Sequence, residues 1–120
     1  VIMSEPTEQA QDLSQKHCRP CEGGVPPLDQ QIIDALLKRL PEWRYYKGRI
    51  AKTFTFRNHY QTLALVNAIA WISHRENHHP VLEVAYNTCE VRYHTHAIGG
   101  LSENDFICAA KVEKLLSAEE

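Results

Sequence analysis

The sequence has no long apolar run, no block of like charges and no leader-like start. No stretch approaches the roughly 20 consecutive apolar residues that a membrane-spanning helix needs, so we expect no membrane contact. The first residues lack the charged and apolar regions of a secretory signal, which favours a cytoplasmic location. The formal net charge is -2, without the basic excess that is typical of proteins that bind nucleic acid directly.

Cysteine is sparse and mostly scattered. Of the four cysteines, only Cys18 and Cys21 have the spacing of a motif. A zinc site would need a second pair of ligands, so a structural or incidental role is favoured over metal binding with help from His17, or over redox chemistry. Cys89 and Cys108 fall in a predicted strand and helix, where small buried thiols are common.

The composition suits one domain with a modest core. The chain has 120 residues, of which 43% are hydrophobic and 23% charged, as is usual for a globular protein. Residues 1–27 are polar and contain Gly-Gly and Pro-Pro pairs, which predicts an irregular or flexible N-terminal segment. Residues 28–120 are expected to form the single folded domain.

Apolar periodicity and turn residues predict seven elements. They are a helix over 28–40, strands over 43–46 and 50–56, a helix from 58 to about 78, strands over 82–86 and 90–95, and a helix from 102 onward. The order α-β-β-α-β-β-α favours an α+β fold, a four-stranded antiparallel sheet with three helices packed on one face. Unpaired sheet edges favour self-association, so we expect a homodimer or homotetramer.

Two adjacent histidines precede a proline at the predicted end of the long helix. Pro80 disfavours helical geometry at His79, which places His78 and His79 near the helix C-terminus. The helix dipole there favours the imidazolium form by about 0.3–1 kcal/mol. Because histidine exchanges protons near neutral pH, the pair could transfer protons, or it could simply cap the last carbonyls of the helix.

A third histidine lies at the predicted end of the last strand. His96 enters the Gly99-Gly100 loop, and loops on rigid strands are where sites are often built. It shares a strand face with His94, so the two could chelate a metal, or could belong to a solvated polar face. A zinc site would need a third ligand, and no further metal motif supports one.

Asp105 has two interpretations. The spacing Ser102-x-x-Asp105 resembles a capping box, in which the carboxylate returns to the amide of the first cap residue. Capping alone would explain this carboxylate, and a role in chemistry is compatible with it.

Together these residues resemble the pterin-4a-carbinolamine dehydratase family over residues 28 to 116. The resemblance rests on His78-His79-Pro80, Tyr86, Val91, Thr95-His96, Gly100-Leu101-Ser102 and Asp105, with Phe54 and Phe56 upstream. The first and last histidines lie 18 residues apart, and this spacing with the Gly-Leu-Ser-x-x-Asp tail is far more specific than any single element. The Cys18-x-x-Cys21 segment resembles bacterial members that accompany phenylalanine hydroxylase.

The resemblance implies a 4a-hydroxytetrahydrobiopterin dehydratase, a hydro-lyase that converts 4a-hydroxytetrahydropterin to quinonoid dihydropterin. Such an enzyme recycles the pterin cofactor of aromatic hydroxylation and needs no metal or organic cofactor. The resemblance implies that His78, His79 and His96 carry the acid–base work and hold the pterin. Our hypothesis is that His78 and His96 exchange protons while His79 positions the ring. The implied site comprises catalytic His78, His79 and His96, and substrate-binding Asp105, Pro80 and Thr95.

One position departs from the family pattern. His74 stands where many members have a glutamate, one helical turn before His78. This second imidazole could affect His78, or it could be only an exposed helix residue. Glu76 is near, but helical geometry predicts that it points to a different side of the helix.

Two other functions accompany this resemblance. An animal member also serves as a dimerisation cofactor of a transcription factor, which makes a protein-binding module the competing class. An accessory role in molybdopterin metabolism is a third possibility. The presence of all three histidines favours the enzyme.

Overall fold

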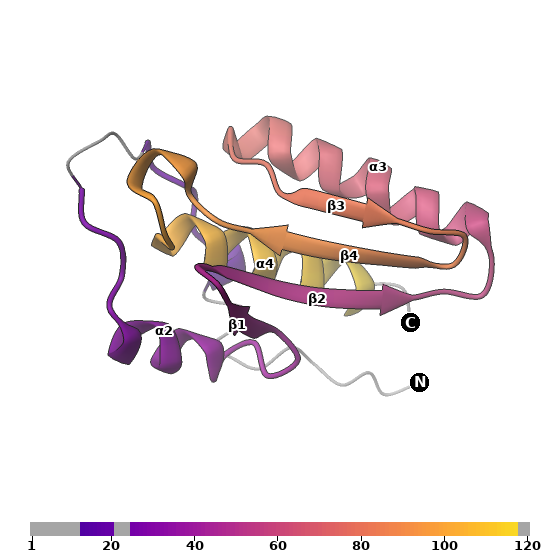
Figure 1. Ribbon diagram of the computed structural model, residues 1–120. Helices are drawn as coiled ribbons and strands as arrows, with labels where there is room; N and C mark the ends of the chain where they lie inside the picture. The colour runs from indigo at the N-terminus through magenta and orange to yellow at the C-terminus, as the bar shows by residue number, and fades with distance from the viewer. Residues whose placement is uncertain (1–12, 21–24, 118–120) are drawn as a thin grey trace.

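A four-stranded antiparallel sheet, ordered β1-β2-β4-β3, organises the chain in a computed structural model that describes residues 13–20 and 25–117 (Figure 1). The elements are α2 (Gln30–Leu37), β1 (Arg44–Tyr46), β2 (Arg49–Thr55), α3 (His59–Glu76), β3 (Val81–Val84), β4 (Thr88–Tyr93), a short 3-10 helix η1 (His96–Ile98) and α4 (Glu103–Ser117). This confirms the predicted α+β class and the order of its main elements. In the described ranges, no helix is both long and apolar enough to span a bilayer.

The core lies between the sheet and the helices α3 and α4. These helices contact each other and both contact β4. Along β4, buried Cys89, Val91 and Tyr93 alternate with the partly exposed Glu90 and Arg92. This period of two directs one face of the sheet at the helices and leaves the other face to charged side chains.

Side-chain caps set the starts of two helices. Asn58 caps α3, because its Oδ1 accepts a hydrogen bond from the Gln61 amide at 2.9 Å. Asp29 is the cap of α2, where it accepts a hydrogen bond from the Ile32 amide at 2.9 Å.

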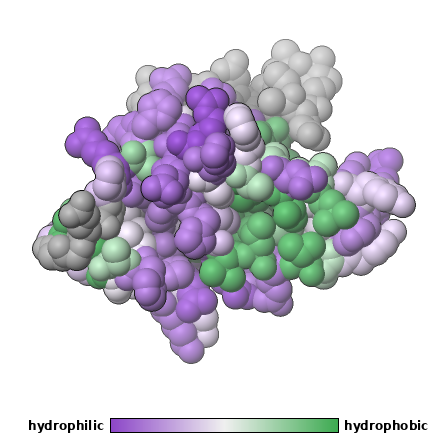
Figure 2. All heavy atoms as spheres, turned by 90° about the horizontal axis from the view of Figure 1, so that it is seen from above, coloured by the Kyte–Doolittle hydropathy of each residue, from purple (hydrophilic) through white to green (hydrophobic). Residues whose placement is uncertain are grey.

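The two outer surfaces differ in character. On the open face of the sheet, Arg44 and Arg92 both pair with Glu90, and Arg92 also pairs with Glu83. Such exposed pairs contribute little stability, about 0–1 kcal/mol each, but they keep this face hydrophilic. Figure 2 looks onto the side that carries α3 and β3, where apolar side chains gather instead.

Part of the N-terminal segment belongs to the core. Residues 13–15 are helical, and Leu13 has no exposed surface and joins the main buried cluster. Lys111 Nζ donates to the Ser14 carbonyl at 2.7 Å, which ties the segment to α4. The polar composition of residues 1–27 predicts an irregular or flexible segment, and it gives no sign of this anchoring.

Leu13→Ala should lower the free energy of unfolding by about 2–5 kcal/mol, since it removes a fully buried side chain. The matched control is Val25→Ala, because Val25 is 49% exposed and its loss should cost less than about 0.5 kcal/mol. Urea denaturation measures both, and equal small effects would show that the N-terminal segment does not pack on the core.

Candidate active site

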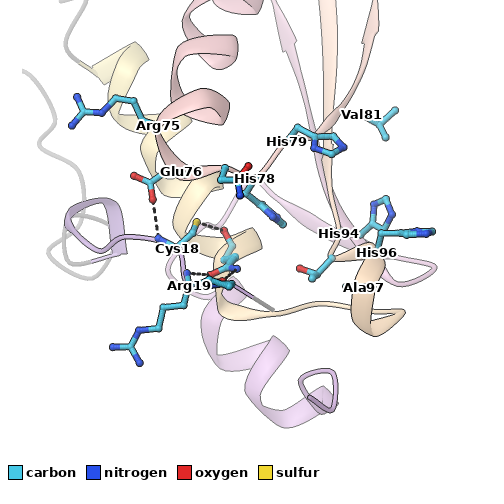
Figure 3. Close-up of a pocket in the computed structure, with 14 residues that line it drawn as sticks. Cys18, Arg19, Arg75, Glu76, His78, His79, Val81, His94, His96 and Ala97 are labelled. Carbon is cyan, nitrogen blue, oxygen red and sulfur yellow. Dashed lines mark hydrogen bonds between the residues drawn. The ribbon is translucent and has the colours of Figure 1, made fainter. Parts of the chain in front are cut away.

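A pocket of about 530 Å³ opens where the end of α3, the end of β4 and the N-terminal segment meet. Its volume lies in the range of small-molecule sites. Four imidazoles line it, those of His78, His79, His94 and His96 (Figure 3). The histidines that were predicted separately from a helix end and a strand end therefore share one pocket.

The backbone conformation at the end of α3 determines the position of His78. The helix ends at Glu76, and Asn77 adopts a left-handed conformation with φ of 53°. The His78 amide then donates to the Ser73 carbonyl at 3.2 Å, as in a Schellman motif. Since backbone amides satisfy this carbonyl, the His78 ring does not act as a cap and turns toward Asp105.

A hydrogen-bond network centred on Asp105 orients the His78 side chain. His78 Nε2 lies 2.6 Å from Asp105 Oδ1, and Asp105 has no exposed surface. The other carboxylate oxygen, Oδ2, accepts from the Thr95 hydroxyl at 2.7 Å and from the Ser102 amide at 3.0 Å. The predicted capping box is confirmed by this amide contact, and one carboxylate both caps α4 and orients a histidine.

This pairing determines which atom of His78 can act on a ligand. A carboxylate facing Nε2 favours the tautomer that carries its proton on Nε2. The Tyr93 ring stacks on the imidazole, with centroids 5.9 Å apart and planes 9° apart, which fixes the ring orientation. Nδ1 is then the ring nitrogen left for exchange with a bound molecule.

The loop after β4 presents the remaining predicted histidine. Thr95 and Gly100 form an antiparallel bridge in which the Thr95 amide donates to the Gly100 carbonyl at 2.9 Å. This bridge closes a short loop that begins with η1 and exposes His96. The His94 ring meets that of His96 edge to face, with centroids 6.3 Å apart.

Not every predicted site residue faces the pocket. His78, His79, Thr95 and His96 line it, whereas Pro80 does not. Asp105 does not line the pocket either, but it contacts two residues that do, His78 and Thr95.

Glu76 lies on a different side of α3 from His74, as expected, because it lines the histidine pocket and His74 does not. The helix ends at Glu76 and the left-handed Asn77 reverses the chain, so helical angular spacing does not apply to His78. Glu76 Oε1 accepts from the Cys18 amide at 2.8 Å, a contact across 58 residues that no local sequence signal predicts.

His74 is an exposed helix residue, which agrees with the second of the two interpretations given for it above. Its ring packs against Trp71 with centroids 5.6 Å apart, and it does not line the histidine pocket.

The cysteines have no metal partners in the described part of the chain. There, no group of three or more histidine, cysteine or acidic side chains is arranged to hold a metal ion. Cys18 Sγ lies 3.5 Å from Cys108 Sγ and 3.7 Å from the Asn104 carbonyl. The hydrogen bond to Cys18, followed by burial, raises the pKa of Cys108, which keeps this thiol protonated. Cys21, the other half of the predicted motif, lies outside the described residues.

Two further groups near the pocket have shifted pKa values. Burial raises the pKa of Glu76, but hydrogen bonds from the Cys18 amide and His17, with the charge of Lys111, outweigh burial and lower it overall. Burial raises the pKa of Tyr93 well above its usual value.

The fold and pocket define an α+β protein with a histidine-lined small-molecule site that is backed by a buried carboxylate. The family model described as Pterin 4 alpha carbinolamine dehydratase matches residues 26–115. The chain belongs to this family, which confirms the resemblance seen in the sequence.

Similar proteins agree with this assignment. A protein of Nitrosospira multiformis is 61% identical over 104 residues, which cover 87% of this chain and 92% of the relative. One of Nitrosomonas europaea is 58% identical over 108 residues, covering 89% and 96%. Both are named "Putative pterin-4-alpha-carbinolamine dehydratase".

A solved structure shares the fold. The crystal structure of a transcriptional coactivator/pterin dehydratase from Brucella melitensis superimposes with a TM-score of 0.72 at 24% identity. The alignment covers 74% of this chain and 97% of the other.

Tyr93→Phe should leave the free energy of unfolding unchanged or raise it by up to about 1–3 kcal/mol. The Tyr93 hydroxyl is buried without a hydrogen-bond partner among the described residues, and an unsatisfied buried group is costly. Chemical denaturation measures the change, with Tyr46→Phe on the exposed face as control. A clear loss of stability would show that the hydroxyl has a partner.

The stability difference between the wild type and Glu76→Gln should depend on pH. The folded pKa of Glu76 lies below its ordinary value, so ionised Glu76 stabilises the fold at pH values above the unfolded pKa. This stabilisation is lost as the pH falls through the folded pKa. Denaturation between pH 7 and pH 3 should show the gap shrinking, and a gap that is constant across this range would contradict the assignment.

Proposed function

We propose that the protein catalyses the dehydration of pterin-4a-carbinolamine to quinonoid dihydropterin by proton transfer between histidines. The names of the family and of the relatives support the reaction. The observation that carries the mechanism is the His78–Asp105 pair at the wall of a pocket with three further imidazoles.

The reaction suits such a pocket. The 4a-hydroxyl gains a proton and leaves as water, while the neighbouring ring nitrogen loses a proton, so no proton is consumed overall. An acid and a base must therefore act on one bound molecule. General acid–base groups contribute about 10²–10⁴-fold each.

The environment of each histidine suggests its role. His78 acts as the base through Nδ1, since the Asp105 carboxylate at Nε2 stabilises the positive charge that the ring acquires. His96 is exposed, so it can protonate the leaving hydroxyl and regain its proton from solvent. His79 positions the pterin ring, and Thr95 supports Asp105 through its hydroxyl.

This activity would link the protein functionally to an aromatic hydroxylase, whose pterin cofactor it would help to recycle. Dehydration returns the oxidised pterin to a form that can be reduced again, which is what a phenylalanine hydroxylase requires of a partner enzyme. The proposed steps are proton transfers, and the residues named above provide them without a metal or organic cofactor.

The apolar side of the molecule supports assembly of the chain with itself. Leu63 and Trp71 on α3 and Val81 and Val84 on β3 are exposed, with Trp71 at 61%. Exposed apolar surface next to an unpaired strand edge is typical of protein interfaces. We therefore include a homodimer or homotetramer in the proposal.

Replacing His78 or His96 with glutamine should each lower kcat about 10²–10⁴-fold, because each removes one partner of the proton transfer. Dehydration of freshly prepared carbinolamine is measured against the spontaneous rate, with and without a chelator. His74→Gln is the matched control: it changes the same residue type on the adjoining helix, outside the pocket, and should keep full activity.

An unchanged rate in His96→Gln would rule out its assignment as the acid. No acceleration by the wild type over the spontaneous reaction would contradict the proposed function itself. Loss of activity with the chelator would point to a metal.

A further inference from the structure

The N-terminal segment forms one side of the histidine pocket. Cys18, Arg19 and Pro20 line it together with the histidines, and we call residues 18–20 the N-terminal wall. Figure 3 shows the side chains of Arg19 and Arg75 extending away from the histidines. The wall therefore meets the pocket with its backbone and smaller side chains, which suits contact with the edge or face of a planar heterocycle.

Glu76 holds the first half of this wall. One carboxylate oxygen accepts from the Cys18 amide at 2.8 Å, and the other lies 3.0 Å from His17 Nδ1. Lys111 Nζ lies 3.6 Å from the same carboxylate. The side chain of Glu76 is only 5% exposed, so its contact with the Cys18 amide is largely shielded from water, whereas the His17 ring is 74% exposed and adds a weaker surface contact.

Asn104 holds the second half. Its Oδ1 accepts from the Arg19 amide at 3.0 Å, and its Nδ2 donates to the Arg19 carbonyl at 2.6 Å. Asn104 is itself 7% exposed, at the start of α4. A single amide side chain thus satisfies both backbone groups of one wall residue, which fixes the backbone and leaves its side chain outside.

The contacts of the wall are separate from those of the catalytic histidine. His78 is oriented by Asp105 and Tyr93, and neither belongs to the wall or to its two anchors. Loss of an anchor should therefore displace the wall without changing the His78–Asp105 pair. Such a change weakens binding of the ground state and the transition state alike, which raises KM and leaves kcat unchanged.

We propose that the N-terminal wall is a substrate-binding surface for the pterin ring, and that Glu76 and Asn104 are the positioning residues that hold it. This inference rests on the proposed function for the identity of the ligand. It adds residues from a segment that the sequence gives no reason to include in the site.

Glu76→Ala and Asn104→Ala should each raise KM for the carbinolamine about tenfold, with kcat within about twofold of the wild type. Glu76→Gln keeps an acceptor for the Cys18 amide and should recover most of the affinity. Glu103→Ala is the control, because its pair with Lys16 also joins the segment to α4 but is half exposed and lies outside the pocket. Thermal denaturation establishes that each variant is folded.

A fall in kcat shared by Glu76→Ala and Glu76→Gln, with KM unchanged, would overturn the proposal, because Glu76 would then act on the chemistry. Unchanged KM in both alanine variants would overturn it as well. Binding of biopterin, followed by fluorescence, tests the wall without turnover and should weaken by the same factor. If the wild type binds biopterin but does not dehydrate the carbinolamine, the proposed function fails and the wall is still tested.

Discussion

The hydrogen bond between His78 and Asp105 is the interaction on which the site depends. A carboxylate with no exposed surface is stable only when its oxygens are satisfied, and here the His78 imidazole, the Thr95 hydroxyl and the Ser102 amide satisfy them. Because α4 begins at this carboxylate, the helix and the histidine cannot be positioned independently. The Asp105 carboxylate therefore determines both the capping of α4 and the orientation of His78.

The pocket is completed by chain segments from opposite ends of the sequence. The sheet and α3 place the histidines, but one wall comes from residues that precede the sheet by more than twenty positions. Buried Leu13 anchors that segment to the core, and Glu76 and Asn104 fix its backbone beside the histidines. Because polar side chains, and not secondary structure, hold the N-terminal wall, the residues of this wall can change without altering the fold.

Sequence patterns predicted the elements and the histidines well, because both depend on local interactions. Alternation in β4 and the effect of Pro80 on the end of α3 each follow from residues a few positions apart. The dual role of Asp105 could be stated only as two alternatives, since choosing between them requires the position of His78, 27 residues away. The wall and the role of Glu76 in holding it were missed because these contacts span 58 to 90 residues, which no local pattern predicts.

Nitrogen-detected NMR of the imidazoles reports which ring nitrogen of His78 carries the proton, and so tests whether Asp105 sets the tautomer of this histidine. The pairing with Asp105 predicts that neutral His78 is protonated on Nε2, that bound biopterin shifts the Nδ1 resonance, and that Asp105→Ala abolishes this preference. A His78 protonated on Nδ1 in the wild type, or unaffected by loss of Asp105, would contradict the account.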